Sequence, residues 1–132
     1  MELDIQKILS EIEKDVSLDE LNLKEAQFKL PAIKHKYAGL LIRSKIQLGE
    51  KRKELEEHRK QVIEQIKEKS PVKLAPNTLF DTASELPAIK KIKTDIEQIE
   101  LLITLLEKTE KTLSSMTYDI KNIIDIQKLE TT

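Results

Sequence analysis

The residues of this sequence whose types and spacing could do chemistry are positively charged. Lys45, Arg52 and Arg59 recur every seven residues in a stretch with a helical pattern, which places them about 10.5 Å apart along one side of the helix. Such a line of cations can follow a phosphate backbone, through contacts that weaken steeply with salt. Five more cations widen the candidate DNA-binding set: Arg43, Lys51, Lys53, Lys60 and Lys67.

A second interpretation of these cations remains open. Glu50, Glu54, Glu56 and Glu57 lie among them and balance part of their charge. Lys/Arg-rich helices of this kind are also typical of the solvated flank of a coiled coil. The aromatic residues that usually stack the bases of single strands are few, and we interpret them as packing residues: Phe28, Tyr37, Phe80 and Tyr118.

Catalytic chemistry has little support in the sequence. The two histidines, His35 and His58, are 23 residues apart, there is no cysteine, and no cluster has the spacing of metal ligands. There is no phosphate-binding loop and no dinucleotide fingerprint. We interpret Asp15 and Asp19 as local helix caps rather than as a pair of catalytic carboxylates. The sequence therefore predicts a protein that is not an enzyme, with no metal and no cofactor.

Composition predicts an all-α fold. Of 132 residues, 36% are charged and 3% aromatic, with two Gly, four Pro and no Trp. This is the composition of long helices and coiled coils, and the length suits one domain, 1–132. Because long thin helices bury less surface than a compact domain, we expect a homo-oligomer. No apolar run approaches roughly 20 residues and the N-terminus is acidic, so we expect a cytoplasmic protein that does not enter a membrane.

Charge is concentrated in the middle of the chain. The whole chain has a net charge of −1, but residues 32–69 carry eleven Lys/Arg against six Asp/Glu. Residues 1–31 carry four against eight, and residues 70–132 carry eight against ten. The basic segment therefore differs from both of its neighbours, which matters more than the total.

Hydrophobic spacing predicts the elements. Short N-terminal helices cover residues 2–30, and the second of them begins at a capping box of Ser17 and Glu20. A basic long helix follows at 31–69, opened by Pro31 and interrupted only by Gly39 and Gly49. Residues 70–86 are expected to be a loop, 87–113 an apolar long helix and 115–130 a terminal helix that follows a break at Ser114 and Ser115.

The two long helices are expected to form an antiparallel hairpin. The first has only half of a heptad seam, formed by Leu41, Leu48, Leu55 and Val62. The cations Lys45, Arg52 and Arg59 occupy the positions of the other half. The second has both halves: Ile89, Ile92, Ile96, Ile99, Ile103, Leu106 and Leu113. Packing these apolar stripes together leaves the cations of the first helix at its margin.

The terminal helix is apolar on two sides. Met116, Ile120, Ile123 and Ile124 share one face with Ile126 at its margin, while Tyr118 and Leu129 point the opposite way. A single packing partner covers only one of these faces. We therefore expect this helix to join identical subunits through these seven residues.

Two stretches of the chain resemble a known family. Residues 15–37, "DVSLDELNLKEAQFKLPAIKHKY", resemble the N-terminal signature of the UvsY family of phage recombination mediator proteins, with matches at Asp15, Asp19, Leu23, Pro31, Lys36 and Tyr37. The C-terminus resembles the family's last segment at Ile120, Lys121, Asn122, Ile124, Asp125 and Lys128. Lys34 replaces a usual His, and "IEQIKEKSP" stands where the family has Tyr-Tyr-x-Gly-Lys.

The resemblance implies a function. It implies a homo-oligomeric ring that binds single-stranded DNA and helps to load a RecA-like recombinase onto DNA covered by a single-strand DNA-binding protein, in the host cytoplasm if the protein is viral. The alternative from another class is a structural coiled-coil protein, such as a prefoldin-like chaperone or scaffold. That alternative predicts no salt-sensitive affinity for single-stranded DNA.

Overall fold

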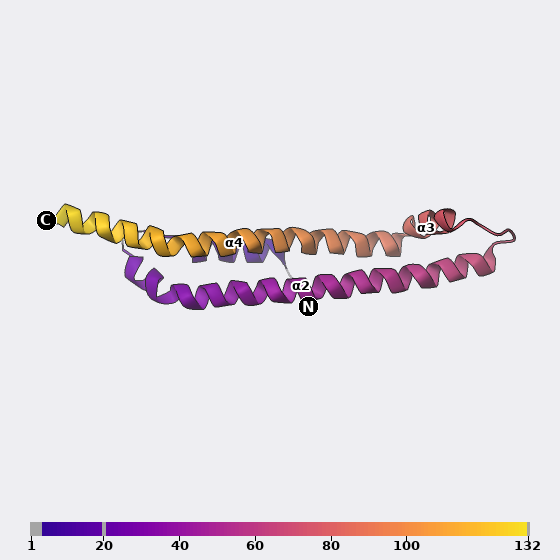
Figure 1. The fold of residues 1–132 in the computed structure, drawn as a ribbon, viewed down its shortest axis with the longest axis horizontal. Coiled ribbons are helices and arrows are strands. Elements are labelled where there is room, and N and C mark those ends of the chain that lie inside the picture. Colours follow the sequence, from indigo (N-terminus) through magenta and orange to yellow (C-terminus); the bar gives the residue numbers. More distant parts are fainter. Residues whose placement is uncertain (1–3, 20, 132) are drawn as a thin grey trace. The chain divides into compact units, whose positions relative to one another are not determined.

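Four helices make up the part of the chain that the structure describes. The structure is a computed structural model that describes residues 4–19 and 21–131, and it contains no strand within them. The helices are α1 (Ile5–Asp15), α2 (Leu23–Lys69), α3 (Pro76–Ser84) and α4 (Pro87–Thr131) (Figure 1). The predicted all-α class is confirmed.

The chain divides into two compact units, and α2 and α4 contribute to both. The first unit combines Met1–Arg43 with Leu102–Thr132, and the second is Ser44–Leu101. In the first unit the Lys34 ammonium on α2 donates to Thr117 Oγ1 on α4 at 3.1 Å. In the second, Arg52 on α2 lies 3.4 Å from the Glu100 carboxylate on α4. The predicted antiparallel pairing of the two long helices is confirmed.

Each unit has its own apolar core. In the first, α1 supplies two isoleucines, and α2 and α4 supply the rest: Ile8, Ile12, Leu23, Leu30, Tyr37, Leu41, Leu102, Ile103, Leu106, Leu113, Met116 and Ile120. In the second, α3 adds two residues to the long helices: Val62, Leu79, Ala83, Ile89, Ile92, Ile96 and Ile99. Leu48 and Leu55 are only half-buried. The apolar seam of α4 is therefore complete, and that of α2 is partial.

The expected boundary at Pro31 is wrong, because α2 continues through it. A proline inside a helix removes one backbone hydrogen bond and crowds the preceding turn. Leu30 is 5% exposed and Tyr37 is fully buried, so both sides of the proline pack into the same core. Burial of these side chains holds the two segments in one helix.

The expected loop at 70–86 contains a helix, α3. Pro76 stands in its first turn, where the missing N–H is not needed, and Ala75 before it is extended. Leu79 and Ala83, four residues apart, are both buried, which gives this helix an inner face. In the sequence, the only sign of this helix is the spacing of four residues between Leu79 and Ala83, which amounts to a single helical turn.

The expected break at Ser114 and Ser115 is also wrong, because α4 runs without interruption to Thr131. Serine lowers helix stability by only roughly half a kcal/mol relative to alanine. Leu113, Met116 and Ile120 are buried on both sides of the serine pair at helical spacing. The terminal segment 115–130 is thus the end of α4 rather than a separate helix.

The expected second N-terminal helix does not begin at Ser17, because residues 17–19 are not helical and α2 begins at Leu23. The Asp4 carboxylate accepts from the backbone N–H of Gln6 and Lys7 and starts α1. Glu20 of the expected capping box lies outside the described residues. Two other residues form a reciprocal pair ahead of α2: Asp19 Oδ1 accepts from the Asn22 N–H at 2.9 Å, and Asn22 Oδ1 accepts from the Asp19 N–H at 2.8 Å.

A polar cluster joins α1 to α2 in the first unit. The buried Tyr37 hydroxyl donates to Asp15 Oδ2 at 2.6 Å, and the Lys36 ammonium lies 2.9 Å from the same oxygen. Lys36 also pairs with Glu11 at 3.0 Å. The interpretation of Asp15 as a local cap is therefore wrong, because its partners lie more than twenty residues away. We call Glu11, Asp15, Lys36 and Tyr37 the Tyr37 cluster.

Three members of the Tyr37 cluster, Asp15, Lys36 and Tyr37, have shifted pKa values. Burial acts to raise the pKa of Asp15, but the Tyr37 hydroxyl and the Lys36 ammonium together bring it below its usual value. Burial acts to lower the pKa of Lys36, yet its bonds to Asp15 and Glu11 raise it. Burial and donation to Asp15 both raise the pKa of Tyr37. At neutral pH these shifts stabilise ionised Asp15, charged Lys36 and neutral Tyr37.

Replacing Tyr37 tests the cluster. Tyr37→Phe is expected to lower the free energy of unfolding by about 1–2 kcal/mol, because it removes a buried bond to a charged acceptor. The part of this stabilisation that requires ionised Asp15 is present above about pH 4. It is lost as the pH falls through the lowered pKa of Asp15. Urea unfolding at pH 7 and pH 3, at one protein concentration, measures this. Tyr118→Phe, at an exposed tyrosine, is the control; an equal cost at both positions would refute the assignment.

Gly49 offers a test of the exposed side of α2. It is exposed inside the helix, and a Cβ added there meets no atom within 4 Å. Gly49→Ala is therefore expected to raise the free energy of unfolding by roughly 0.5–1 kcal/mol, since glycine loses more backbone entropy on folding. Thermal unfolding monitored by circular dichroism measures the change. A loss of stability instead would show that another molecule covers this position.

Candidate nucleic-acid interface

All eight candidate cations lie on α2, where the structure sorts them into different environments. Arg43 belongs to the first unit and is exposed. The other seven belong to the second unit. The sequence already gives their positions along the helix. The structure adds the group that each ammonium or guanidinium contacts.

Three of the eight cations pair with carboxylates. Lys51 lies 3.2 Å from Glu54 and 3.8 Å from Asp95, and its side chain is 28% exposed. Arg52 lies 3.4 Å from Glu100, and Lys67 lies 3.7 Å from Glu64. Arg52 and Lys51 connect α2 to α4, which is what a coiled-coil flank does. Their charge is therefore partly neutralised within the protein.

Arg59 has a different partner. Its guanidinium lies 4.3 Å from the centre of the Phe80 ring, so it joins α2 to α3 by a cation–π contact. Its Nε atom is buried and has no hydrogen-bond partner. Phe80 stays 45% exposed. Sequence reasoning treated Phe80 as a packing residue in a loop and missed this pair, because the helix that positions the ring was not recognised.

Three cations on the second unit present open charge. Lys45, Lys53 and Lys60 are exposed, and no ion pair of theirs is seen within residues 4–19 and 21–131. They lie within a sector of roughly 80° around α2, and Lys53 and Lys60 are about 10.5 Å apart along it. We call these three residues the open basic face. Lys67 lies in the same sector but is paired with Glu64.

The apolar residues at the end of α4, in residues 115–131, divide into covered and exposed sets, and we call this segment the α4 tail. Met116 and Ile120 are 3% and 1% exposed and pack in the core of their own chain, so they are not available to a neighbouring subunit. Ile123 and Ile124 are half-buried. Tyr118, Ile126 and Leu129 are 71%, 54% and 77% exposed. One face of this segment is thus satisfied internally, and the other lies open.

Sequence reasoning missed a second set of exposed apolar side chains. Phe28, Ile42 and Ile46 on α2 are between 57% and 77% exposed. The spacing of 14 residues between Phe28 and Ile42, then four to Ile46, places them near one side of the helix. That spacing was visible in the sequence, but the helix was interpreted from the longer heptad seam through Leu41 and Val62, and this second apolar side was missed.

The family model for UvsY, described as a recombination, repair and single-stranded-DNA-binding protein, matches residues 11–132. The chain belongs to the UvsY family. Two crystal structures of the bacteriophage T4 recombination mediator protein UvsY share the fold. No curated protein matches the sequence.

The UvsY crystal structures match along the whole chain. The lattice type IV structure has a TM-score of 0.84 and 16% identity, and the match covers 97% of this chain and 99% of that one. The lattice type II structure has a TM-score of 0.76 and 15% identity, with 99% and 100% covered. At this identity the similarity establishes the fold.

The residues that carry the resemblance to the UvsY family are mainly structural in this chain. Asp15, Lys36 and Tyr37 form the Tyr37 cluster, and Leu23 and Ile120 are buried. A small cavity of about 170 Å³ separates the Pro31 turn from α4; it is lined by Gln27, Leu30, Pro31, Lys34, Thr117 and Ile120. The signature therefore reports how the first unit packs, and the eight candidate DNA-binding cations lie outside it.

Neither a metal-binding cluster nor a membrane-spanning helix is found in the described part of the chain. Residues 4–19 and 21–131 contain no group of three or more His, Cys, Asp or Glu side chains that could hold a metal ion. Within the same residues, no helix has both the length and the apolar character needed to cross a membrane.

Proposed function

We propose that this chain is a recombination mediator. It binds single-stranded DNA along α2 and promotes the loading of a RecA-like recombinase onto DNA covered by a single-strand DNA-binding protein, in recombination and repair in the host cytoplasm. The observation that supports this most is the open basic face, Lys45, Lys53 and Lys60, on a member of a DNA-binding family. Unpaired ammonium groups gain the most from contact with phosphates.

The open basic face alone is a weak binder. Exposed Glu56 and Glu57 lie within one turn of Lys53 and Lys60 and reduce the local potential. A ring of identical subunits repeats the face, so that several weak interactions with one strand add as intramolecular events. Bending the strand around this repeated surface weakens the hold of the covering protein and presents the DNA to the recombinase.

The exposed side of the α4 tail is our candidate for the contact between subunits. Tyr118, Ile126 and Leu129 are large, apolar and exposed. An apolar face on one subunit that meets a different face on the next gives a head-to-tail contact, and such contacts form a ring when the rotation between neighbouring subunits closes. Half-buried Ile123 and Ile124 extend this face toward the core.

The DNA surface is tested by Lys53→Ala combined with Lys60→Ala. This double variant is expected to weaken binding to a fluorescent oligo(dT). It is also expected to flatten the slope of log affinity against log salt, by about 0.7 for each phosphate that the variant no longer neutralises. Fluorescence anisotropy at several salt concentrations measures both quantities. The change in slope is the decisive reading, because it reports the number of neutralised phosphates directly.

The first control carries the same change of charge as the test variant, and the second changes one paired cation. Lys90→Ala combined with Lys91→Ala removes two cations from α4, and Lys51→Ala removes one that Glu54 and Asp95 already neutralise. Both are expected to bind DNA nearly as the wild type does. If the controls weaken binding as much as the Lys53/Lys60 variant, total charge decides affinity and the proposed face is wrong.

The subunit contact is tested by Tyr118→Asp combined with Ile126→Asp. Two carboxylates in an apolar contact have no partner there, so the assembly is expected to dissociate. Sedimentation velocity measures the size of the particle, and circular dichroism checks that the helices persist. Thr131→Asp is the control, since this exposed residue points roughly 140° away from both Tyr118 and Ile126 on the same helix. An intact assembly in the double variant would exclude this face.

The alternative of a structural coiled-coil protein also has an observation behind it. Lys51, Arg52 and Lys67 pair with carboxylates of their own chain, as flanking residues of a coiled coil do. This alternative shares the oligomer and predicts no salt-sensitive binding to oligo(dT). The same titration of the wild-type protein therefore separates the two functions.

A further inference from the structure

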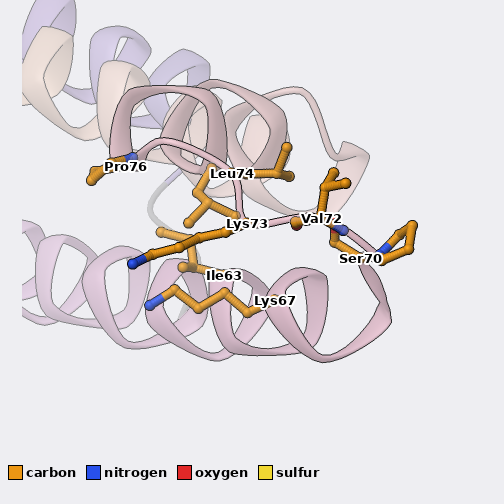
Figure 2. A pocket seen from close by; sticks show the side chains of 9 residues that line it. Ile63, Lys67, Ser70, Val72, Lys73, Leu74 and Pro76 are labelled. Carbon is orange, nitrogen blue, oxygen red and sulfur yellow. Dashed lines mark hydrogen bonds between the residues drawn. The ribbon is translucent and has the colours of Figure 1, made fainter.

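The connection between α2 and α3 encloses an apolar pocket that the DNA surface does not use. Its volume is about 580 Å³, within the range of roughly 300–1,000 Å³ that ligand pockets occupy. It lies wholly in the second unit and is lined by Ile63, Lys67, Ser70, Pro71, Val72, Lys73, Leu74, Pro76 and Leu79. Figure 2 shows these side chains around the hollow between the end of α2 and the chain that leads into α3.

The pocket has an aliphatic interior and two cations. Among its lining residues, Leu79 is buried, Ile63 and Leu74 are half-buried, and Val72 is 66% exposed. The side chains of Lys67 and Lys73 extend beside Leu74 and Ile63, and their amine ends point to the same side (Figure 2). Lys73 has no ion pair within the described residues, and Lys67 reaches Glu64 only at 3.7 Å. Two ammonium groups therefore stand next to an uncovered apolar surface.

The polar atoms of the lining exclude one kind of ligand. The Ser70 hydroxyl already donates to the Val72 carbonyl at 2.7 Å and accepts from the Val72 N–H at 3.4 Å. The remaining lining side chains are aliphatic apart from the two lysines, and none is aromatic. A nucleobase placed there gains no stacking partner, and no side chain pairs with the donors on its edge, which costs free energy. A hydrocarbon side chain has no such requirement.

We propose that this pocket is a docking site for an acidic segment of a partner protein, with the segment's apolar side chain in the pocket and its carboxylates on Lys67 and Lys73. Charge complementarity selects the segment, and burial of its apolar side chain supplies the affinity. The contact joins an extended peptide to one subunit, so a ring presents several such sites. The proposal does not depend on the DNA surface, because Lys45, Lys53 and Lys60 do not line the pocket.

α3 keeps the pocket open. Leu79 forms part of the lining, and its neighbour Phe80 packs on Arg59 of α2. Pro71 and Pro76 lie on either side of Lys73 and restrict the backbone that carries it. The pocket is therefore largely formed before a peptide arrives, which reduces the entropy cost of binding.

The test uses the full-length protein and a fluorescein-labelled peptide of four aspartates followed by leucine and phenylalanine. Fluorescence anisotropy is expected to show binding that weakens with salt. A peptide with serines in place of the aspartates, and one with alanines in place of leucine and phenylalanine, are each expected to bind about tenfold more weakly or worse. If all three peptides bind alike or none binds, the proposal is refuted.

Variants place the peptide in the pocket. Lys73→Glu reverses a charge and Val72→Asp adds one to the apolar edge, and each is expected to weaken peptide binding by about tenfold. Lys91→Glu, an exposed lysine on α4 outside the pocket, is the matched control and is expected to leave it unchanged. Circular dichroism confirms that each variant is folded. Both test positions are exposed, so neither substitution is expected to disturb the core. If one variant perturbs the helices, the other still tests the pocket.

Three results would overturn the proposal. One is that Lys73→Glu and Val72→Asp bind the acidic peptide as the wild type does. Another is that both variants lose affinity for oligo(dT) while the peptide does not bind, which would assign the pocket to DNA. The third is that both variants sediment as smaller particles, which would assign it to a second copy of this chain. Oligo(dT) binding of the wild type is measured in parallel, so that a failure of the DNA function is seen separately.

Discussion

The structure depends on an unequal packing of α2 against α4. In the second unit α4 presents a continuous apolar face, whereas α2 offers a narrow line because cations occupy the positions beside it. A narrow line buries little area, and the free energy of helix packing is roughly proportional to that area. Leu48 and Leu55 accordingly stay half-buried. α3 adds Leu79 and Ala83 to the core of the second unit.

The same constraint decides which cations can act on a ligand. Arg52 and Lys51 stand beside the packed line and reach Glu100 and Asp95 on α4, so they help to join the helices. Lys53 and Lys60 are one position further around the helix and reach no carboxylate of α4. Paired Lys51 and open Lys53 are only two residues apart. Lys45 is open although it shares the heptad position of paired Arg52, so the carboxylate across the interface decides which cation is open. The residue type is the same in both cases, so composition alone does not distinguish them.

Much of the fold could be predicted from the sequence, since period and composition are local signals. The all-α class, the pairing of the two long helices and the start of α4 at Pro87 followed from them. The boundaries at Pro31 and at Ser114 were wrong because burial of Leu30, Tyr37, Leu113 and Met116 outweighs a local preference. The helix α3 was missed because its inner face consists of only two residues.

The candidate site was less predictable for a physical reason. A sequence shows where cations recur but not which carboxylate lies across the interface, and that determines whether Lys51 or Lys53 is open. Asp15 was assigned to a cap, although its partners are Lys36 and Tyr37, because hydrogen bonds between distant residues leave no local pattern. The family signature contains both Asp15 and Tyr37, 22 positions apart, but only the structure shows that they are bonded to each other.

The division of the chain into one continuous and one discontinuous unit has a kinetic consequence. The second unit, Ser44–Leu101, contains all of its own segments in one stretch, whereas the first must bring residues before 44 to residues after 101. The entropy cost of closing a loop grows with its length, and slow folding accompanies pairings between distant residues. Formation of the continuous unit shortens the effective loop that the chain ends must close. Assembly of the native state is therefore favoured from the middle of the polypeptide toward its two termini, and the contact between the residues before 44 and those after 101 is completed last.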